Sequence, residues 1–171
     1  DILFMKFLPL EIKSKIFDKR SHKIKSYYYH HDLGPNGHWI ERWGYAKSRI
    51  YTNNLGFKDK KIRTIDFKKN NILFIGDSFT EGVGVEFENS FVGIIEKIIT
   101  KRNTDFTVLN AGVASYSPII ILSKLHYILK NETPITKVFV AICEGDFYDD
   151  IFRYKSIDAN YIVEHDDFIN N

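Results

Sequence analysis

The stretch that decides the fold is Ile72-Leu73-Phe74-Ile75-Gly76-Asp77-Ser78-Phe79-Thr80-Glu81-Gly82. Its first four residues form an apolar run that is typical of a short buried strand. Gly76 interrupts this run, and the residues after Ser78 continue as a helix. The stretch therefore predicts a strand–turn–helix junction with the serine at the carboxyl end of a sheet strand. The amides and the positive dipole end of that helix would favour an anion beside the hydroxyl.

From residue 71 onward, strand patterns alternate with helix patterns. Short buried strands are predicted at 106–110 and 138–142. Apolar residues with helical spacing are Phe91, Ile94, Ile95, Ile98 and Ile99 in one helix, and Ile121, Leu122, Leu125, Ile128 and Leu129 in a second that Pro118 opens. Such alternation is typical of a parallel sheet covered on both faces, so we expect an α/β fold with a three-layer αβα, flavodoxin-like parallel sheet. Right-handed crossovers would bring the strand ends to one edge.

The first 70 residues differ in character, because aromatic side chains are interleaved there with histidines and basic residues. The rings are Tyr27, Tyr28, Tyr29, Trp39, Trp43, Tyr45 and Tyr51. Two interpretations stay open: the rings fill a small subdomain packed against the sheet, or they stack on sugars or bases. We interpret residues 1–70 as an aromatic-rich N-terminal extension packed on the core, with a short amphipathic helix at 9–19, and residues 71–171 as the α/β domain.

Composition narrows the functional classes. With 44% hydrophobic and 27% charged residues the chain is globular, and its net charge of +2 is too small to favour nucleic acid as a partner. One cysteine excludes an internal disulfide framework, and no apolar run approaches the roughly 20 residues that span a bilayer. His30, His31 and His38 lack the spacing of metal ligands and are expected in a solvated loop. The basic residues from Lys58 to Lys69 are expected in an exposed connection.

Five residues of the opening stretch carry a family resemblance: Gly76, Asp77, Ser78, Thr80 and Gly82. They match Gly-Asp-Ser-x-Thr-x-Gly, and the stretch resembles the first signature block of the SGNH (GDSL-type) esterases and acyltransferases. Residues 51–59 more loosely resemble a segment that precedes the serine in bacterial members, some of which act on acylated cell-surface polysaccharides. The resemblance implies an esterase or O-acyltransferase acting on acyl, especially O-acetyl, esters, without a cofactor. Its substrate would be an acylated small molecule or polysaccharide.

The resemblance also implies roles for single residues. Ser78 would be the nucleophile, and its own amide and that of Gly112 would bind the oxyanion. Asp77 is expected to hold the turn by hydrogen bonds to nearby amides. In the family's third block an asparagine precedes the aspartate and donates to the oxyanion, whereas Gly145 stands before Asp146 here. The alternative for Ser78 is an ordinary helix cap.

The general base is the part that departs most from the family. In the family, the general base is a histidine in an Asp-x-x-His motif near the carboxyl end. This sequence contains no such motif. His165 is the one histidine after the third block and is the candidate base, whereas His126 is expected in solvent. Because the chain starts without methionine and has no room for two further strand–helix units, we expect an incomplete, truncated member of the family.

Other chemistry and a second functional class were weighed at the same strand ends. Cys143 is expected to be structural, and the cluster Asp146, Asp149 and Asp150 is expected to be exposed rather than a metal site. The second class is a catalytically silent carbohydrate-binding or assembly module that stacks Trp39, Trp43 and the tyrosines on sugars. The sequence leaves the oligomeric state open, and an extracytoplasmic or membrane-associated location of the parent protein is one alternative for the compartment.

Overall fold

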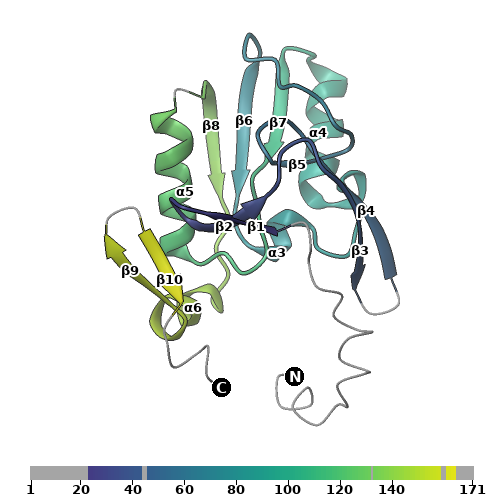
Figure 1. Ribbon diagram of the computed structural model, residues 1–171. Helices are drawn as coiled ribbons and strands as arrows, with labels where there is room; N and C mark the ends of the chain where they lie inside the picture. Colours follow the sequence, from purple (N-terminus) through teal and green to yellow (C-terminus); the bar gives the residue numbers. More distant parts are fainter. Residues whose placement is uncertain (1–22, 44–45, 132, 159–160, 165–171) are drawn as a thin grey trace.

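The computed structural model describes residues 23–43, 46–131, 133–158 and 161–164 (Figure 1). The helix expected at 9–19 therefore lies outside the described residues. In chain order the elements are β1 (Lys23–Ser26), β2 (His30–Leu33), β3 (His38–Trp43), β4 (Ala46–Thr52), β5 (Lys58–Asp59), β6 (Asn70–Ile75), α3 (Ser78–Glu81), the 3₁₀ turn η1 (Phe87–Asn89), α4 (Phe91–Arg102), β7 (Phe106–Asn110), α5 (Pro118–Lys130), β8 (Ile135–Val140), α6 (Asp146–Phe152), β9 (Tyr154–Asp158) and β10 (Tyr161–Glu164).

The centre of the molecule is a six-stranded mixed sheet of order β3-β4-β5-β7-β6-β8. The three strands predicted from the apolar runs are parallel, with β6 between β7 and β8. The expected α/β class is thus confirmed, but the prediction of a purely parallel sheet is wrong. The reason is that β3, β4 and β5 are joined to one another in antiparallel fashion, and β5 extends the sheet by pairing Lys58 with Asn110 of β7. Residues 38–59 therefore belong to the same sheet as the three parallel strands.

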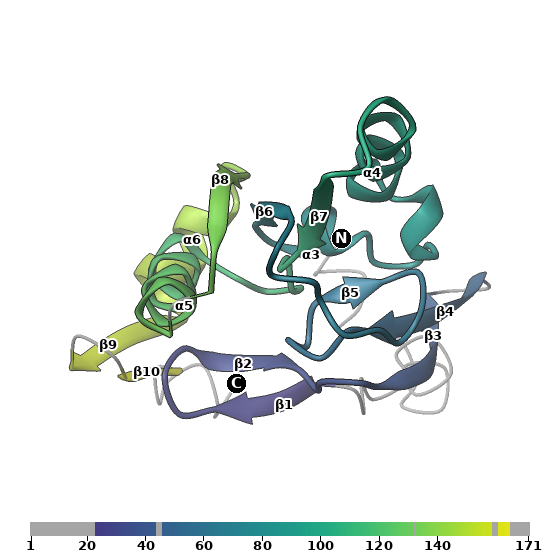
Figure 2. The ribbon, with the colours of Figure 1, turned by 90° about the horizontal axis from the view of Figure 1, so that it is seen from above.

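The two faces of β6 carry separate apolar clusters. Ile72 and Phe74 pack with Val92 of α4 on one face, whereas Leu73 and Ile75 pack with Ile120 of α5 on the other. This alternation is the period of two expected for a strand buried on both faces. Figure 2 shows the result, with α4 and α5 on opposite sides of the parallel strands.

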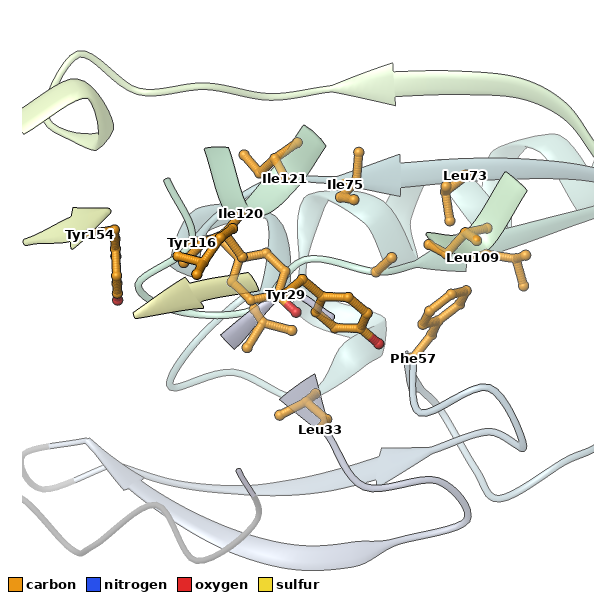
Figure 3. Close-up of a cluster of buried hydrophobic side chains, with 14 of the residues drawn as sticks. Tyr29, Leu33, Phe57, Leu73, Ile75, Leu109, Tyr116, Ile120, Ile121 and Tyr154 are labelled. Atoms are coloured by element: carbon orange, nitrogen blue, oxygen red, sulfur yellow. The ribbon is translucent and has the colours of Figure 1, made fainter. Parts of the chain in front are cut away.

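The larger cluster, on the α5 face, is completed by residues from both ends of the described chain. Tyr29 and Leu33 come from the β1–β2 hairpin, and Tyr154 comes from the β9–β10 hairpin (Figure 3). Ile162 of the same hairpin also belongs to the cluster. The core interpretation of the aromatic region therefore holds for Tyr29, which is 8% exposed. Tyr27 and Tyr28, in contrast, are exposed.

Both predicted long helices are present, and each has a recognisable start. The Oγ of Ser90 accepts a hydrogen bond from the Gly93 N–H at the beginning of α4, and Pro118 occupies the first turn of α5. None of the helices in the described ranges combines the length and the apolar character that a transmembrane span requires.

Candidate active site

Ser78 lies at the predicted junction between β6 and a short helix. Asp77 caps α3, since its Oδ1 accepts a hydrogen bond of 3.0 Å from the Phe79 N–H. The Oγ of Ser78 donates to Asp77 Oδ2 over 3.4 Å, and the serine is half-buried rather than enclosed in the core. The expected turn-holding role of Asp77 is therefore confirmed. Because Asp77 is the cap, the serine is the first residue of the helix and is not itself an N-cap.

The loops after the three parallel strands meet at this point, as predicted. The Val113 N–H donates to Gly76 O over 3.1 Å, and the Ala141 N–H donates to Ile75 O over 2.9 Å. Gly76 permits this approach, because a Cβ there would lie 2.3 Å from Thr80 Oγ1 and 2.6 Å from Ala141 O. The glycine of the signature is thus a packing requirement of the converging loops.

Gly112 is pressed against α3. A Cβ at this position would lie 2.6 Å from the Glu81 nitrogen and 2.7 Å from Thr80 Cβ, so the site excludes any side chain. The Gly112 N–H donates to Asn110 Oδ1 over 3.1 Å, and Asn110 Nδ2 donates in turn to Thr80 O over 2.8 Å. The Gly112 amide is therefore engaged here, and the need for glycine comes from contact with α3 instead of access for a substrate carbonyl. Its oxyanion role stays a prediction, and it requires the Asn110 amide to turn away.

The third loop places Gly145 at the start of α6 in an exposed position. No atom lies within 4 Å of the Cβ that could be added to Gly145, and its φ of −61° is ordinary for any residue. The neighbouring Asp146 is buried, and its Oδ2 accepts a hydrogen bond of 2.8 Å from the Cys143 N–H. An asparagine side chain would therefore fit at 145, although the sequence supplies none.

Asp77, Cys143 and Asp146 form a compact polar cluster, with one donor atom from each within 4.8 Å of the others. Removal from water raises the pKa of the Cys143 thiol, and the carboxylates of Asp77 and Asp146 raise it further. Burial likewise raises the pKa of Asp146, against the opposing hydrogen bond from Cys143. A raised thiol pKa disfavours the thiolate, which agrees with a structural cysteine. The Asp150 carboxylate has a structural partner of its own, the Ile119 N–H at the start of α5.

A cavity of about 280 Å³ opens beside the serine and is lined by Ser78, Phe79, Gly82 and Val83. Phe79, which is 71% exposed, forms an apolar wall of this cavity beside Ser78. An acyl group of a few carbons could reach Ser78 through this opening.

The candidate base His165 lies outside the described residues. In the described part of the chain, Ser78 Oγ has the single hydrogen-bond partner Asp77. Histidines in that part have contacts elsewhere: His31 Nε2 lies 3.0 Å from Ala114 O, His38 stacks on Tyr51, and His126 is exposed on α5. The expectation of a solvated loop is wrong for all three histidines, because His30 and His31 lie in β2 and His38 lies in β3. Of the three, His31 is buried, His30 is half-buried and His38 is exposed.

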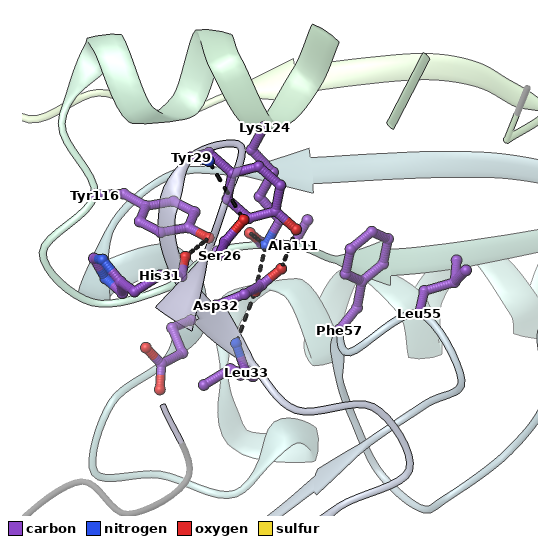
Figure 4. A network of polar contacts seen from close by, with 12 residues as sticks. Ser26, Tyr29, His31, Asp32, Leu33, Leu55, Phe57, Ala111, Tyr116 and Lys124 are labelled. Carbon is purple, nitrogen blue, oxygen red and sulfur yellow. Dashed lines mark hydrogen bonds and ion pairs between the residues drawn. The ribbon is translucent and has the colours of Figure 1, made fainter. Parts of the chain in front are cut away.

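Two buried lysines were missed by sequence reasoning. Lys58 was expected in an exposed connection but is 1% exposed, and its Nζ donates to Gly82 O and Val85 O over 2.7 and 2.8 Å. Lys124 is fully buried on α5 and donates to Asp32 Oδ1 over 2.8 Å and to Ala111 O over 3.1 Å (Figure 4). The available signal was the helical spacing of Ile121, Lys124 and Ile128, which puts the lysine on the buried face.

Lys124 is the centre of a polar network between the β1–β2 hairpin and the loop that carries Gly112 (Figure 4). Asp32 also accepts hydrogen bonds from the Tyr29 hydroxyl and from the N–H of the next residue, Leu33. The ammonium lies 5.0 Å from the centre of the Tyr116 ring, whose hydroxyl donates to His31 O. The N-terminal region therefore fixes the second loop of the site through buried polar contacts.

The comparisons with known proteins add no family to this geometry: no protein-family model matches the chain, and the search of curated proteins found no match.

Proposed function

We propose that this chain carries a serine-dependent esterase or O-acyltransferase domain of the SGNH type, with Ser78 as nucleophile. The observation that carries the proposal is the position of the Ser78 hydroxyl, half-buried beside a cavity at the N-terminus of α3, where β6 ends. In the reaction, Ser78 Oγ gives its proton to a base and attacks the carbonyl carbon of an acyl ester; the ester C–O bond then breaks, and the base returns the proton to the leaving alcohol oxygen. Water or a sugar hydroxyl then takes the acyl group from the serine.

The fold supports this proposal through the arrangement of the parallel strands. The order β7-β6-β8 puts the first strand of the series between the next two, as in flavodoxin-like α/β proteins. Helices α4 and α5 lie on opposite faces of these strands, which is compatible with a three-layer SGNH domain. Ligands of such sheets bind outside the carboxyl ends of the strands, and Ser78 lies there.

The proposed oxyanion site is formed by the amides of Ser78 and Gly112, and Gly145 stands at the sequence position of the family's third donor. It would need the Gly112 N–H to leave Asn110 Oδ1 when substrate binds. The base in this proposal is His165, or a histidine of a longer parent chain. The substrate is an acylated small molecule or polysaccharide, with an O-acetyl ester of a carbohydrate as the first choice.

A fluorophosphonate probe tests the nucleophile directly. We expect mass spectrometry to find the adduct on Ser78 in the native chain and no adduct in Ser78→Ala. Hydrolysis of p-nitrophenyl acetate should be faster for the native chain than for Ser78→Ala. An unlabelled serine together with equal hydrolysis rates would overturn the proposal.

One observation favours a second function, a carbohydrate-binding or assembly module without catalysis. Exposed Tyr28 packs on Tyr127 with ring centres 4.6 Å apart, and both line a cavity of about 130 Å³ with Lys130 and Asn131. Aromatic faces beside amide groups are suited to sugar rings. Titration of Ser78→Ala and of the double variant Ser78→Ala/Tyr28→Ala with an O-acetylated oligosaccharide separates the two functions. The module would be favoured if Tyr28→Ala abolishes the binding and the fluorophosphonate probe does not label the native chain.

A further inference from the structure

Helix α3, which carries Ser78, cannot hold its own geometry. It has four residues, Ser78–Glu81, and a helix of this length has no independent stability in water. Its N-terminus is fixed by Asp77, whereas its last turn contains no basic residue to satisfy the carbonyl end. Gly82 closes the helix with φ of 71°, a left-handed conformation that suits glycine.

The carbonyl end is instead satisfied from another part of the chain, by Lys58. Its ammonium donates to Gly82 O and Val85 O, so one side chain ties the cap of α3 to the turn that follows. Gly82 also lines the cavity beside Ser78, so Lys58 is hydrogen-bonded to a residue of the proposed acyl site.

The backbone of Lys58 is held in the central sheet. Its strand β5 pairs with Thr52 of β4 on one side and with Asn110 of β7 on the other. Asn110 itself donates to Thr80 O, so the same strand pair holds α3 at a second point. Glu81 continues the connection, because its Oε2 accepts the N–H of Ala114 in the second loop. A shift of the Lys58 ammonium would therefore move α3 relative to β7 and to the loop that carries Gly112.

Charge explains why a buried lysine is tolerated here. Burial lowers the pKa of Lys58, and the charges of Glu81 and Glu41 oppose that shift. The direct partners of the ammonium are the carbonyl of Gly82, which caps α3, and the carbonyl of Val85 in the turn that follows, and a neutral side chain could not satisfy both equally.

We propose that Lys58 is a positioning residue for Ser78: its ammonium fixes the carboxyl end of α3 and thereby sets the orientation of the serine against the Gly112 loop. This role rests on the function proposed above. Lys58 does not touch the reacting atoms, and it acts through the backbone of Gly82 and Val85.

The test compares Lys58→Met, which removes the ammonium and keeps the length, with Lys60→Met. Lys60 lies two residues along the chain and pairs with Glu96 of α4, away from α3. Ile128→Ala, at the far end of α5, serves as a control for lost stability. All variants are compared where denaturant titration shows them fully folded. We expect fluorophosphonate labelling of Ser78 to be at least about tenfold slower in Lys58→Met, since small misplacements of a reacting group cost that much or more. Both controls should stay within about twofold of the native rate.

Amide hydrogen exchange shows where the change arises. Lys58→Met should speed exchange in residues 78–85 and leave residues 106–110 at the native rate. Lys58→Gln, which keeps one donor, should fall between Lys58→Met and the native chain in both measurements. If Lys58→Met is too unstable to compare, this variant carries the test.

The outcomes separate the two proposals. A native chain that carries no label and hydrolyses p-nitrophenyl acetate no faster than Ser78→Ala overturns the proposed function. A labelled native chain, with Lys58→Met or Lys58→Gln labelled as fast as Lys60→Met, overturns the positioning role alone, even where exchange in 78–85 has risen.

Discussion

The strands on the two sides of β6 have similar apolar character but very different surroundings. On one side, residues 107–110 of β7 are all buried: Val108 lies in the α4 cluster, Leu109 lies in the α5 cluster, and β5 pairs with the strand at Asn110. On the other side, β8 has four exposed and two half-buried residues, and it pairs only with β6 in the described part of the chain. We call these sides the closed flank (β7 with β5) and the open flank (β8). The comparison shows that burial depends on what covers a strand, beyond what its sequence contains.

On the α4 face of the sheet, the exposed apolar surface of β8 continues onto the outer residues of α4. The ring of Phe74 contacts both Phe91 of α4 and Phe139 of β8, with ring centres 6.1 and 4.9 Å apart. Phe91 and Phe139 are exposed, as are Ile94 and Ile98 on the same helix. Apolar residues thus surround one buried ring without being covered by other described residues.

The largest loss of stability is expected from breaking the polar network that locks the β1–β2 hairpin to the Gly112 loop. Asp32→Ala leaves the Lys124 ammonium buried without its carboxylate, and this should lower the free energy of unfolding by about 3–5 kcal/mol. Urea denaturation at pH 7 measures the change. Asp66→Ala, at an exposed carboxylate, should alter it by under about 0.5 kcal/mol. A loss below about 1 kcal/mol for Asp32→Ala would show that the network contributes little.

The next prediction uses the free space at Gly145, between β8 of the open flank and α6. Gly145→Asn adds a side-chain amide where the family resemblance places an oxyanion donor, and nothing within 4 Å obstructs it. Because one such donor is worth about 2.7–4 kcal/mol in the transition state, fluorophosphonate labelling of Ser78 should accelerate by about 100- to 1000-fold. Gly145→Ala is the matched control without a donor. Equal rates for the two variants would place the oxyanion elsewhere.

A matched pair of truncations tests the flanks themselves. Leu109→Ala in β7 removes a fully buried side chain and should cost about 2–5 kcal/mol of unfolding free energy. Phe139→Ala in β8 removes a larger side chain that is 50% exposed, and it should cost about half as much or less. Chemical denaturation of both variants under one condition gives the ratio. Losses of equal size would mean that the open flank is covered in solution.

Sequence reasoning succeeded where the signal is local. The run 72–75 followed by Gly76 and Asp77 specifies strand, turn and helix cap within a few residues, and the structure has each of them. The three parallel strands and both long helices were predicted for the same reason. The strands at 38–59 were missed as part of the sheet, because the pairing of Lys58 with Asn110 joins residues far apart in the chain.

The buried faces of the helices were predicted less well. In α5 the buried residues include Ile120 and Lys124, whereas Leu122 and Leu129 of the expected apolar face are about half exposed. Lys124 is buried because Asp32, from a distant hairpin, neutralises it. No local sequence pattern around Lys124 predicts that Asp32 will be its partner. The same limit applies to the Gly112 amide, whose engagement by Asn110 depends on a side-chain orientation that spacing does not encode.

The smallest predicted effect is a pH dependence of the free energy of unfolding, which arises from His31 in β2, beside Ala114 of the Gly112 loop. Burial lowers the pKa of His31 to about 2, and the charge of Lys23 adds to this, whereas the unfolded chain has the ordinary value of 6.5. Below that value the unfolded state binds one more proton than the folded state, so stability falls as the pH falls.

From pH 7.5 to 5.5 the contribution of His31 should amount to about 1.4 kcal/mol, which follows from about 1.36 kcal/mol per pH unit below the unfolded pKa. His31→Gln keeps a donor for Ala114 O and removes the titration. The urea midpoints of the native chain and of this variant should therefore converge as the pH is lowered, because only the native chain loses the His31 contribution. Parallel pH profiles would mean that the imidazole has the same pKa in the folded and the unfolded chain, and therefore that the hairpin does not bury it in solution.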